Sequence, residues 1–315
     1  MSTRPFCPWV DVPRFLYHRV GVRRGLGLVI MRLARHLKRL QLLPVCMDDG
    51  RILYLDLRQP VAIPYLLLGR NRYESGETAV VRSITAPGEV VWDIGANVGW
   101  YSTLLARIVG PKGRVYAFEP GRESLRMLHA STVNAYPQLR IVDQALSDRE
   151  GTGQIHVPKD IGEASLRRLD VGCYSQFCHV TTMDDFIRSK PSAFPVFVKC
   201  DVEGAERDVL AGASRILSSP RPPIWLIEMN PFASARFGYR PEHLTPMLLD
   251  HGQAKYRGFR VHQQSGRLLP LPRRTESIIF NALFVPQWLE DRIVAHQQQY
   301  PWQTSKTTVL AETCG

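Results

Sequence analysis

The chain lacks any hydrophobic run long enough to cross a membrane. No stretch reaches the roughly 18 to 20 consecutive apolar residues that a spanning helix needs. The apolar run 25–31 is short, and Arg32 and Arg35 follow it. No small-residue cleavage motif comes after this run, as it would in a secretory signal peptide. We therefore expect a cytoplasmic protein, with peripheral contact to a membrane left open.

Cysteine is also scarce and has no pattern. Six cysteines are scattered over 315 residues, at positions 7, 46, 173, 178, 200 and 314. A chain of this length can bury a full core and does not need a disulfide framework. Cys173, Cys178 and His179 lie close together, but no second pair of cysteines or histidines completes a zinc-type ligand set. The pattern favours reduced thiols over a thiolate metal site.

Negative charge is nearly absent from the N-terminal part of the chain. Residues 1–47 hold nine Lys or Arg and a single acid, Asp11, whereas the rest holds 31 basic and 28 acidic residues. The net charge of +11 therefore belongs mainly to an N-terminal arm. The near-neutral remainder argues against a long nucleic-acid groove, so we expect no specific nucleic-acid partner.

The basic arm has a helical pattern over residues 15–43. Its apolar residues recur at intervals of four and three and form one stripe, made of Leu26, Ile30, Leu33, Leu37 and Leu40. Basic side chains occupy the other faces of this predicted helix. The stripe can pack on the domain behind it, or the basic helix can lie on an anionic membrane surface. The sequence leaves both interpretations open.

The dinucleotide fingerprint G-x-G-x-x-G, which receives a pyrophosphate, is missing as well. Residues 90–99 read VVWDIGANVG, a predicted buried strand followed by a turn of the form D-x-G-x-N-x-G, with Asp93, Gly95, Asn97 and Gly99 at its defined positions. Asp93 stands where the fingerprint has its first glycine. A carboxylate there repels a pyrophosphate and attracts an ammonium group.

A second predicted strand, RVYAFEP at 114–120, supports a cofactor pocket. It ends on Glu119, twenty residues after Gly99. An acidic residue at about this distance from a glycine-rich turn suits a ribose diol. A cofactor with an adenosine and an amino-acid end but no phosphate fits both features, so we predict S-adenosylmethionine rather than NAD. The alternative is that Asp93 merely caps a turn.

Five motifs together resemble the FkbM-type S-adenosylmethionine-dependent methyltransferases. They are VVWDIGANVGWYS, GRVYAFEP, ALSDREG, VTTMDDFI and VKCDVEGAE, which occur in the family's order over roughly residues 50–230. The run D-x-E-G-A-E at 201–206 is the most specific of them. The resemblance implies that the cofactor is bound by Asp93, Gly95, Asn97, Gly99, Glu119 and Ala145.

The fold class follows from the same resemblance and from the alternation of predicted strands and helices. We expect an α/β fold, a Rossmann-like class I methyltransferase with a mostly parallel sheet and helices on both faces, plus a basic helical N-terminal extension. We divide the chain into an arm at 1–47, a methyltransferase domain at 48–290 and a C-terminal tail at 291–315.

Candidate catalytic residues follow the strand predicted at 196–201. Asp201 ends this strand and is the residue that we expect nearest the chemistry, with Glu203 next. Because side chains alternate along a strand, Lys199 is expected on the same side as Asp201, where it can pair with a carboxylate. Glu206 lies in the first turn of a helix predicted over 203–217, and stabilising the helix dipole is an equally good explanation for it.

A divalent metal is the less favoured alternative at this site. Asp201, Glu228 and Asn230 lie at the ends of adjacent predicted strands, and all three offer the oxygen ligands that Mg²⁺ prefers. We favour an acid network without a metal.

The resemblance implies O-methylation of a hydroxyl on a small molecule, a sugar or a glycolipid. An RNA methyltransferase is the second hypothesis, which the basic arm favours. Against it, the chain has DVEG at 201–204, where amino-nitrogen methylation of nucleobases would call for an N/D-P-P-Y/F motif. A scaffold that binds the cofactor without catalysis is the third hypothesis, and the intact cofactor motifs argue against it.

Overall fold

The structure is a computed structural model, which describes residues 12–13, 16–17, 26–37, 41–47, 49–68, 73–158, 161–167, 173–249, 255–275 and 277–300. Among these residues, no helix is both long and apolar enough to cross a membrane.

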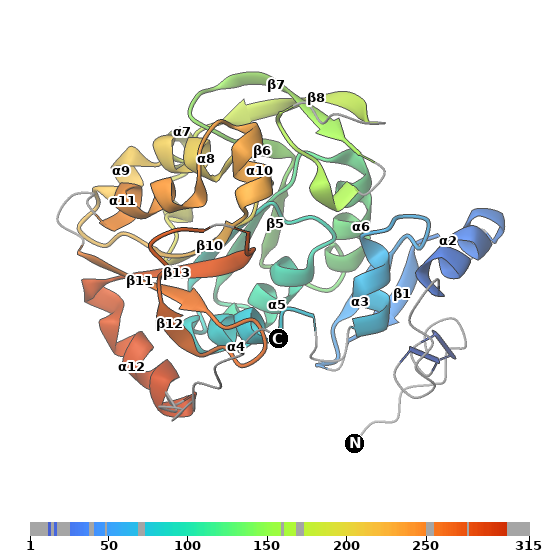
Figure 1. The fold of residues 1–315 in the computed structure, drawn as a ribbon, viewed down its shortest axis with the longest axis horizontal. Helices are drawn as coiled ribbons and strands as arrows, with labels where there is room; N and C mark the ends of the chain where they lie inside the picture. The colour runs from blue at the N-terminus through green and yellow to red at the C-terminus, as the bar shows by residue number, and fades with distance from the viewer. Residues whose placement is uncertain are drawn as a thin grey trace, which may run out of the picture.

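An eight-stranded sheet forms the centre of the molecule, in the order β12-β11-β13-β10-β9-β3-β4-β5 (Figure 1). Its strands are β3 (Val90–Ile94), β4 (Arg114–Phe118), β5 (Leu139–Val142), β9 (Phe197–Cys200), β10 (Ile224–Met229), β11 (Tyr256–Val261), β12 (Leu268–Pro270) and β13 (Phe280–Pro286). The five strands from β10 to β5 are parallel, and β13, β11 and β12 continue the sheet with antiparallel pairings. This arrangement is the Rossmann-like class I fold that the sequence predicts.

Helices cover both faces of the sheet because both faces of its parallel strands are apolar. Val91, Val115 and Phe197 belong to the hydrophobic cluster on one face, and Trp92 and Val198 to the cluster on the other. The first cluster includes α4 (Ser75–Ile84), α5 (Trp100–Val109) and α6 (Arg122–Thr132). The second includes α7 (Met183–Ser189), α8 (Glu206–Ala211), α9 (Ser214–Leu217) and α11 (Leu244–Leu249). Alternate residues of each strand therefore supply two separate cores.

Two elements predicted as continuous are divided in the structure. The sequence predicts one strand over 139–146, but the chain changes sheets at Asp143: β5 pairs with β4, and β6 (Gln144–Leu146) joins a three-stranded sheet with β8 (Tyr174–Thr181) and β7 (Gly151–Val157). The helix predicted over 203–217 forms as α8 and α9. A Cβ at Gly212, between them, would lie 2.1 Å from the carbonyl oxygen of Ser147. Close tertiary approach, which local patterns do not reveal, explains the second division.

Among the described residues, the helical prediction for 15–43 is wrong at residue 37 and at residues 41–43. The helix α2 spans Leu26–His36, and β1 (Leu43–Cys46) then pairs antiparallel with β2 (Ile52–Leu55). Residues 15, 18–25 and 38–40 of the predicted helix lie outside the described residues. We expected the N-terminal arm to end at residue 47 and the methyltransferase domain to begin at residue 48. The β1–β2 hairpin joins residues from both parts, and the boundary itself stays a prediction. Beside it lies α3 (Ala62–Leu68) (Figure 1).

The expected C-terminal tail at 291–315 begins with a packed helix. Residues Glu290–Gln299 form α12, in which Ile293 and His296 are buried. The two ring nitrogens of His296 lie 2.6 Å from Ser83 Oγ and 2.7 Å from the carbonyl oxygen of Gly266. The polar composition of residues 297–315 predicts a loose tail, whereas α12 continues to Gln299. Residues 301–315 lie outside the described residues. The remaining helix, α10, spans Pro231–Arg236.

Substitutions in α12 test whether this helix belongs to the folded domain. Ile293→Ala should lower the free energy of unfolding by about 2 to 5 kcal/mol, because the side chain is 1% exposed and its removal leaves a cavity. Val294→Ala is the matched control, since Val294 is 50% exposed and should change stability by less than about 0.5 kcal/mol. Urea unfolding of both variants measures the difference. Equal stabilities would mean that α12 does not pack in solution.

Candidate functional site

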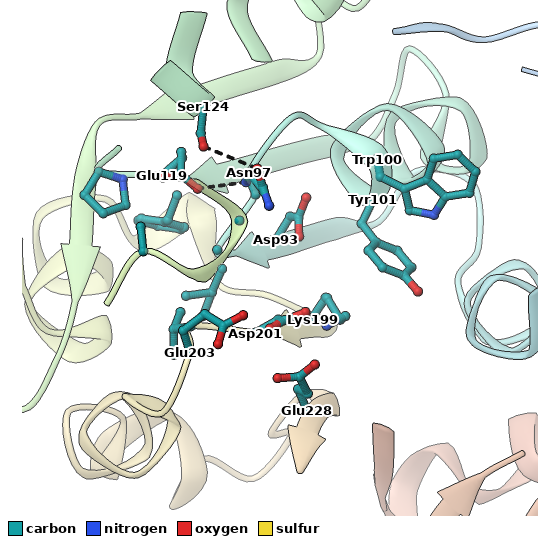
Figure 2. A pocket seen from close by; sticks show the side chains of 18 of the residues that line it. Asp93, Asn97, Trp100, Tyr101, Glu119, Ser124, Lys199, Asp201, Glu203 and Glu228 are labelled. Atoms are coloured by element: carbon teal, nitrogen blue, oxygen red, sulfur yellow. Dashed lines mark hydrogen bonds and ion pairs between the residues drawn. The ribbon is translucent and has the colours of Figure 1, made fainter. Parts of the chain in front are cut away.

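A cavity of about 290 Å³ opens at the carboxyl ends of β3, β4, β9 and β10 (Figure 2). Seven carboxylates line it: Glu74, Asp93, Glu119, Glu163, Asp201, Glu203 and Glu228. Among the described lining residues, Lys199 is the single cationic side chain. A lining of this charge attracts a cationic ligand and opposes a pyrophosphate. The cleft therefore fits a sulfonium cofactor with an ammonium group better than a dinucleotide.

The turn after β3 brings its backbone against the loop after β9. Gly95 has a φ of +80°, and a Cβ there would lie 1.8 Å from the carbonyl oxygen of Asp201. Asn97 also has a positive φ, 49°, and Gly99 has one of 93° before α5 begins at Trp100. Only glycine fits the contact at Gly95, which packs this turn directly against the loop that carries Asp201.

Glu119 is held in place by backbone donors at the end of β4. Its Oε2 accepts the N–H of Asn97 at 2.8 Å, and its Oε1 accepts the N–H of Gly121 at 2.7 Å. The Ser124 hydroxyl donates in turn to Asn97 Oδ1 at 3.3 Å (Figure 2). Burial raises the pKa of Glu119 to about 7, against the opposing effect of the two N–H groups. A carboxylate positioned in this way can accept hydrogen bonds from a ribose diol.

Asp93 lies at the middle of the cleft and is tied to α5. Its Oδ2 accepts the hydroxyl of Ser102 at 2.5 Å, and burial raises the pKa of Asp93 to about 6. In the parallel pairing of β3 with β9, Asp93 is aligned with Lys199. The hydrogen bond from Ser102 engages Oδ2 of Asp93. Contact of Asp93 with the ammonium group of a cofactor stays a prediction.

Ala145 lies on β6 beside the cavity. It is buried, and it lines the cleft together with Gln144, Leu146 and Ile155. These side chains provide a largely apolar surface on the part of the cleft formed by the smaller sheet. A flat apolar group such as an adenine ring suits a wall of this kind.

Three carboxylates gather beyond the ends of β9 and β10. Oxygen atoms of Asp201, Glu203 and Glu228 lie within 4.8 Å of one another. Burial, with Asp201 adding to it, raises the pKa of Glu203 and of Glu228 well above the usual range. In Figure 2 this group lies on one side of Asp93, and Glu119 lies on the other. The cleft thus has one end at Glu119 and an acidic end at Asp201, Glu203 and Glu228.

Lys199 supplies the positive charge of the acidic end. The side chain is buried, and its Nζ donates to Asp201 Oδ2 at 3.0 Å. Burial alone would lower the pKa of Lys199, but the carboxylates of Asp201, Glu74 and Glu228 raise it above its ordinary value. The ammonium therefore stays charged at neutral pH and cannot serve as a base. Its position on the side of Asp201 is the one that strand alternation predicts.

Glu206 has a structural role in the loop that carries Asp201 and Glu203. Its Oε1 accepts the N–H groups of Val202 and Gly204, at 3.0 and 3.2 Å, and its Oε2 accepts the hydroxyl of Tyr239 at 2.9 Å. Gly204 has a φ of +102°, and a Cβ there would lie 2.5 Å from a backbone carbonyl oxygen. The D-x-E-G-A-E motif thus combines two cleft acids with the groups that fix their loop.

Asn230 does not take the role of metal ligand that the less favoured alternative gives it. Its Oδ1 accepts the N–H groups of Phe232 and Ala233, both at 3.1 Å, and thereby caps α10. Its Nδ2 donates to Glu228 at 3.2 Å. Asn230 therefore positions Glu228 and is not a free oxygen ligand. Among the described acids, Asp201, Glu203 and Glu228 have oxygen atoms close enough to share a metal ion.

The family resemblance implies that the segment before β3 covers the cofactor's amino-acid end, but sequence reasoning missed which of its residues reach the cleft. Glu74 lines the cleft in a left-handed conformation, with a φ of 44°, and its Oε2 accepts the Tyr101 hydroxyl at 2.5 Å. The rings of Tyr65, Tyr73 and Trp100 pack beside them, with centroids 4.4 to 5.6 Å apart. Trp100 and Tyr101 directly follow Gly99 in the sequence, and this position beside the turn is the one signal that could have pointed to them.

A family model described as the methyltransferase FkbM domain matches residues 93–261, more than half of the chain. The chain belongs to the FkbM methyltransferase family. The match begins at Asp93 and includes Glu119 as well as the acidic end of the cleft. Membership in this family implies S-adenosylmethionine as the cofactor, and the charge and turn geometry of the cleft fit that cofactor.

Two curated relatives match at low identity. Hexuronic acid methyltransferase AglP of Haloferax volcanii is 29% identical over 153 residues, which cover 48% of this chain and 62% of the relative. The 31-O-demethyl-FK506 methyltransferase FkbM of Streptomyces tacrolimicus is 29% identical over 156 residues, which cover 40% of this chain and 60% of the relative. The chain thus spans less than two thirds of the length of either relative.

Solved methyltransferase structures resemble the chain in fold alone. One from Aquifex aeolicus has a TM-score of 0.39 and 14% identity, and the match covers 70% of this chain and 94% of that one. Fibrillarin of Aeropyrum pernix, with natively bound S-adenosyl-L-methionine, has a TM-score of 0.36 and 13% identity, covering 66% and 72%.

The raised pKa of Glu119 predicts a pH dependence of cofactor binding. A diol donates to the ionised carboxylate, so binding below the pKa of about 7 first requires loss of a proton. Affinity for S-adenosylhomocysteine should therefore fall by up to about tenfold per pH unit below about 7. Calorimetry across this range measures the effect.

The isosteric variant Glu119→Gln provides the control. It should bind the cofactor product more weakly by about 1.5 to 3 kcal/mol at a pH above 7, because the charged acceptor is lost. It should also lose the pH dependence between about 7 and the pKa of Asp93, about 6. A variant that keeps the wild-type slope would show that another group titrates.

Proposed function

We propose that this FkbM methyltransferase transfers a methyl group from S-adenosylmethionine to a hydroxyl of a sugar, a glycolipid or another small molecule. The observation that carries this proposal is the group of Asp201, Glu203 and Glu228, whose carboxylate oxygens lie within 4.8 Å of one another at the acidic end of the cleft. A hydroxyl acceptor must lose a proton on methylation, and several carboxylates at one place can accept it and orient the acceptor.

The cofactor would be held by the first half of the cleft. Glu119 would accept from the ribose diol, the turn of Gly95, Asn97 and Gly99 would allow the close approach, and the wall with Ala145 would cover the adenine. When bound, S-adenosylmethionine supplies an electrophilic methyl group. The acidic lining favours the positively charged cofactor over its neutral-sulfur product.

The acidic end would then handle the acceptor. Asp201 is 30% exposed and can take the proton that leaves the acceptor hydroxyl. Lys199 donates a hydrogen bond to Asp201 Oδ2 and thereby fixes the orientation of the Asp201 carboxylate. Burial and the nearby charge of Asp201 raise the pKa of Glu203 and of Glu228, which favours the protonated form of each. These two side chains would hydrogen-bond to further hydroxyls of a polyol.

Both relatives support an oxygen acceptor over RNA. Their names describe a hexuronic acid and a 31-O-demethyl compound as substrates, which are a sugar acid and a small molecule. The acidic lining of the cleft also opposes entry of the negatively charged phosphodiester backbone of RNA. A methyl donor with a radioactive methyl group, incubated with the protein and separate pools of glycans, glycolipids, small metabolites and RNA, tests the proposal. Label found only in RNA, or in no pool, would overturn it.

Asp201→Asn should separate catalysis from cofactor binding. The amide keeps the shape but cannot accept the proton, so turnover should fall by about 100-fold or more. Affinity for S-adenosylhomocysteine should change little, because Glu119 and the glycine turn remain. The measurement pairs methyl-transfer rates with calorimetry, and near-normal turnover would make Asp201 structural.

Two further experiments sharpen this test. Glu206→Gln, a change of the same size in the same loop, should act through stability, because Glu206 bonds only within the protein fold. Full activity after removal of divalent ions by EDTA would support the acid network without a metal. Activity that is lost with EDTA and restored by Mg²⁺ would instead assign Asp201, Glu203 and Glu228 as metal ligands.

A further inference from the structure

The helix α2 is docked on the domain by one side only. Its buried residues, Leu26, Ile30 and Ala34, belong to the same hydrophobic cluster as the hairpin and α3. A Cβ at Gly27 would lie 3.0 Å from Ile63 Cγ2, so the helix approaches α3 closely here. This contact fixes the orientation of α2 and thereby decides which side chains face outward.

A second apolar stripe on α2 has no partner among the described residues. Val29 and Leu33 on α2 are 51% and 47% exposed, and Leu37, which directly follows the helix, is 38% exposed. Their spacing of four places them in one line, and the N–H of Leu37 donates to the carbonyl of Leu33 at 3.0 Å. The stripe predicted from the sequence is therefore divided: Leu26 and Ile30 are buried, whereas Leu33 and Leu37 are exposed. Its last member, Leu40, lies outside the described residues.

The charge around this exposed stripe is positive. Arg32, Arg35 and His36 lie on α2, and the helix contains no acidic residue. Residues 1–47 carry an excess of eight positive charges, in contrast to the near-neutral remainder of the chain. An exposed apolar line beside basic side chains is the arrangement of helices that lie in the interface of an anionic bilayer.

We propose that α2 docks this protein on an anionic lipid surface. Val29, Leu33 and Leu37 would enter the boundary between headgroups and acyl chains, while Arg32 and Arg35 would contact the headgroup phosphates. A second copy of the chain is the poorer occupant, since its α2 would bring the same positive charges to the contact. Figure 1 shows α2 at the periphery of the molecule, beside β1 and far from α12.

Vesicle sedimentation of the full chain tests this proposal. At low salt the protein should sediment with phosphatidylcholine vesicles that contain phosphatidylglycerol, and it should sediment far less with phosphatidylcholine alone. Arg32→Gln with Arg35→Gln should weaken binding by about 25-fold, about fivefold for each charge. Leu33→Ser should weaken it by about tenfold, through the apolar area lost from the interface.

Matched changes elsewhere on the surface provide controls. Val294→Ser removes an exposed apolar side chain from α12, and Arg273→Gln with Arg274→Gln removes two exposed charges, so neither should alter sedimentation. Binding of S-adenosylhomocysteine by every variant confirms folding and is independent of the membrane. Protein that stays in the supernatant, or equal losses in the control variants, would overturn the proposal. So would a dimer, measured by light scattering, that Leu33→Ser dissociates.

Discussion

The ammonium of Lys199 is the interaction on which the arrangement of the cleft depends. It is buried at the centre of the sheet, aligned with Asp93 and bonded to Asp201, and it also lies near Glu74 and Glu228. Without a cation at this place, four carboxylates would repel one another in a region of low dielectric constant. Lys199 therefore makes it feasible to concentrate acids at the end of β9 while keeping the domain folded.

A second constraint is the close contact between two loops at the carboxyl ends of the strands. Gly95 packs against the carbonyl of Asp201, and Glu206 holds the amides of Val202 and Gly204 in the next turn. The cofactor turn and the acidic loop thus position each other. This explains why the chain needs glycine at 95 and 204, and why a third acid in the D-x-E-G-A-E motif points into the protein rather than into the cleft.

Much of the fold and of the cofactor half of the site could be predicted because the signals are local. A buried strand followed by a glycine-rich turn predicts β3 and the turn that lines the cleft. The acid that directly follows the next strand, Glu119, is predicted by its position in the sequence. Other features depend on partners distant in sequence. Glu74 reaches the cleft because Tyr101 and Lys199 lie nearby, and Asn230 is engaged by the amides of α10. No pattern within either segment reports those neighbours.

The sequence by itself determined the alternation of strands and helices, the family motifs and the charge difference between the arm and the rest. These are properties of residue order, since hydrophobic periodicity and turn chemistry act over a few residues. Only the tertiary structure decided that Leu43–Cys46 form a strand, that α12 packs on the domain and which apolar side chains of α2 remain exposed. Each of these depends on which surfaces meet, because burial is decided by packing between segments far apart in the chain.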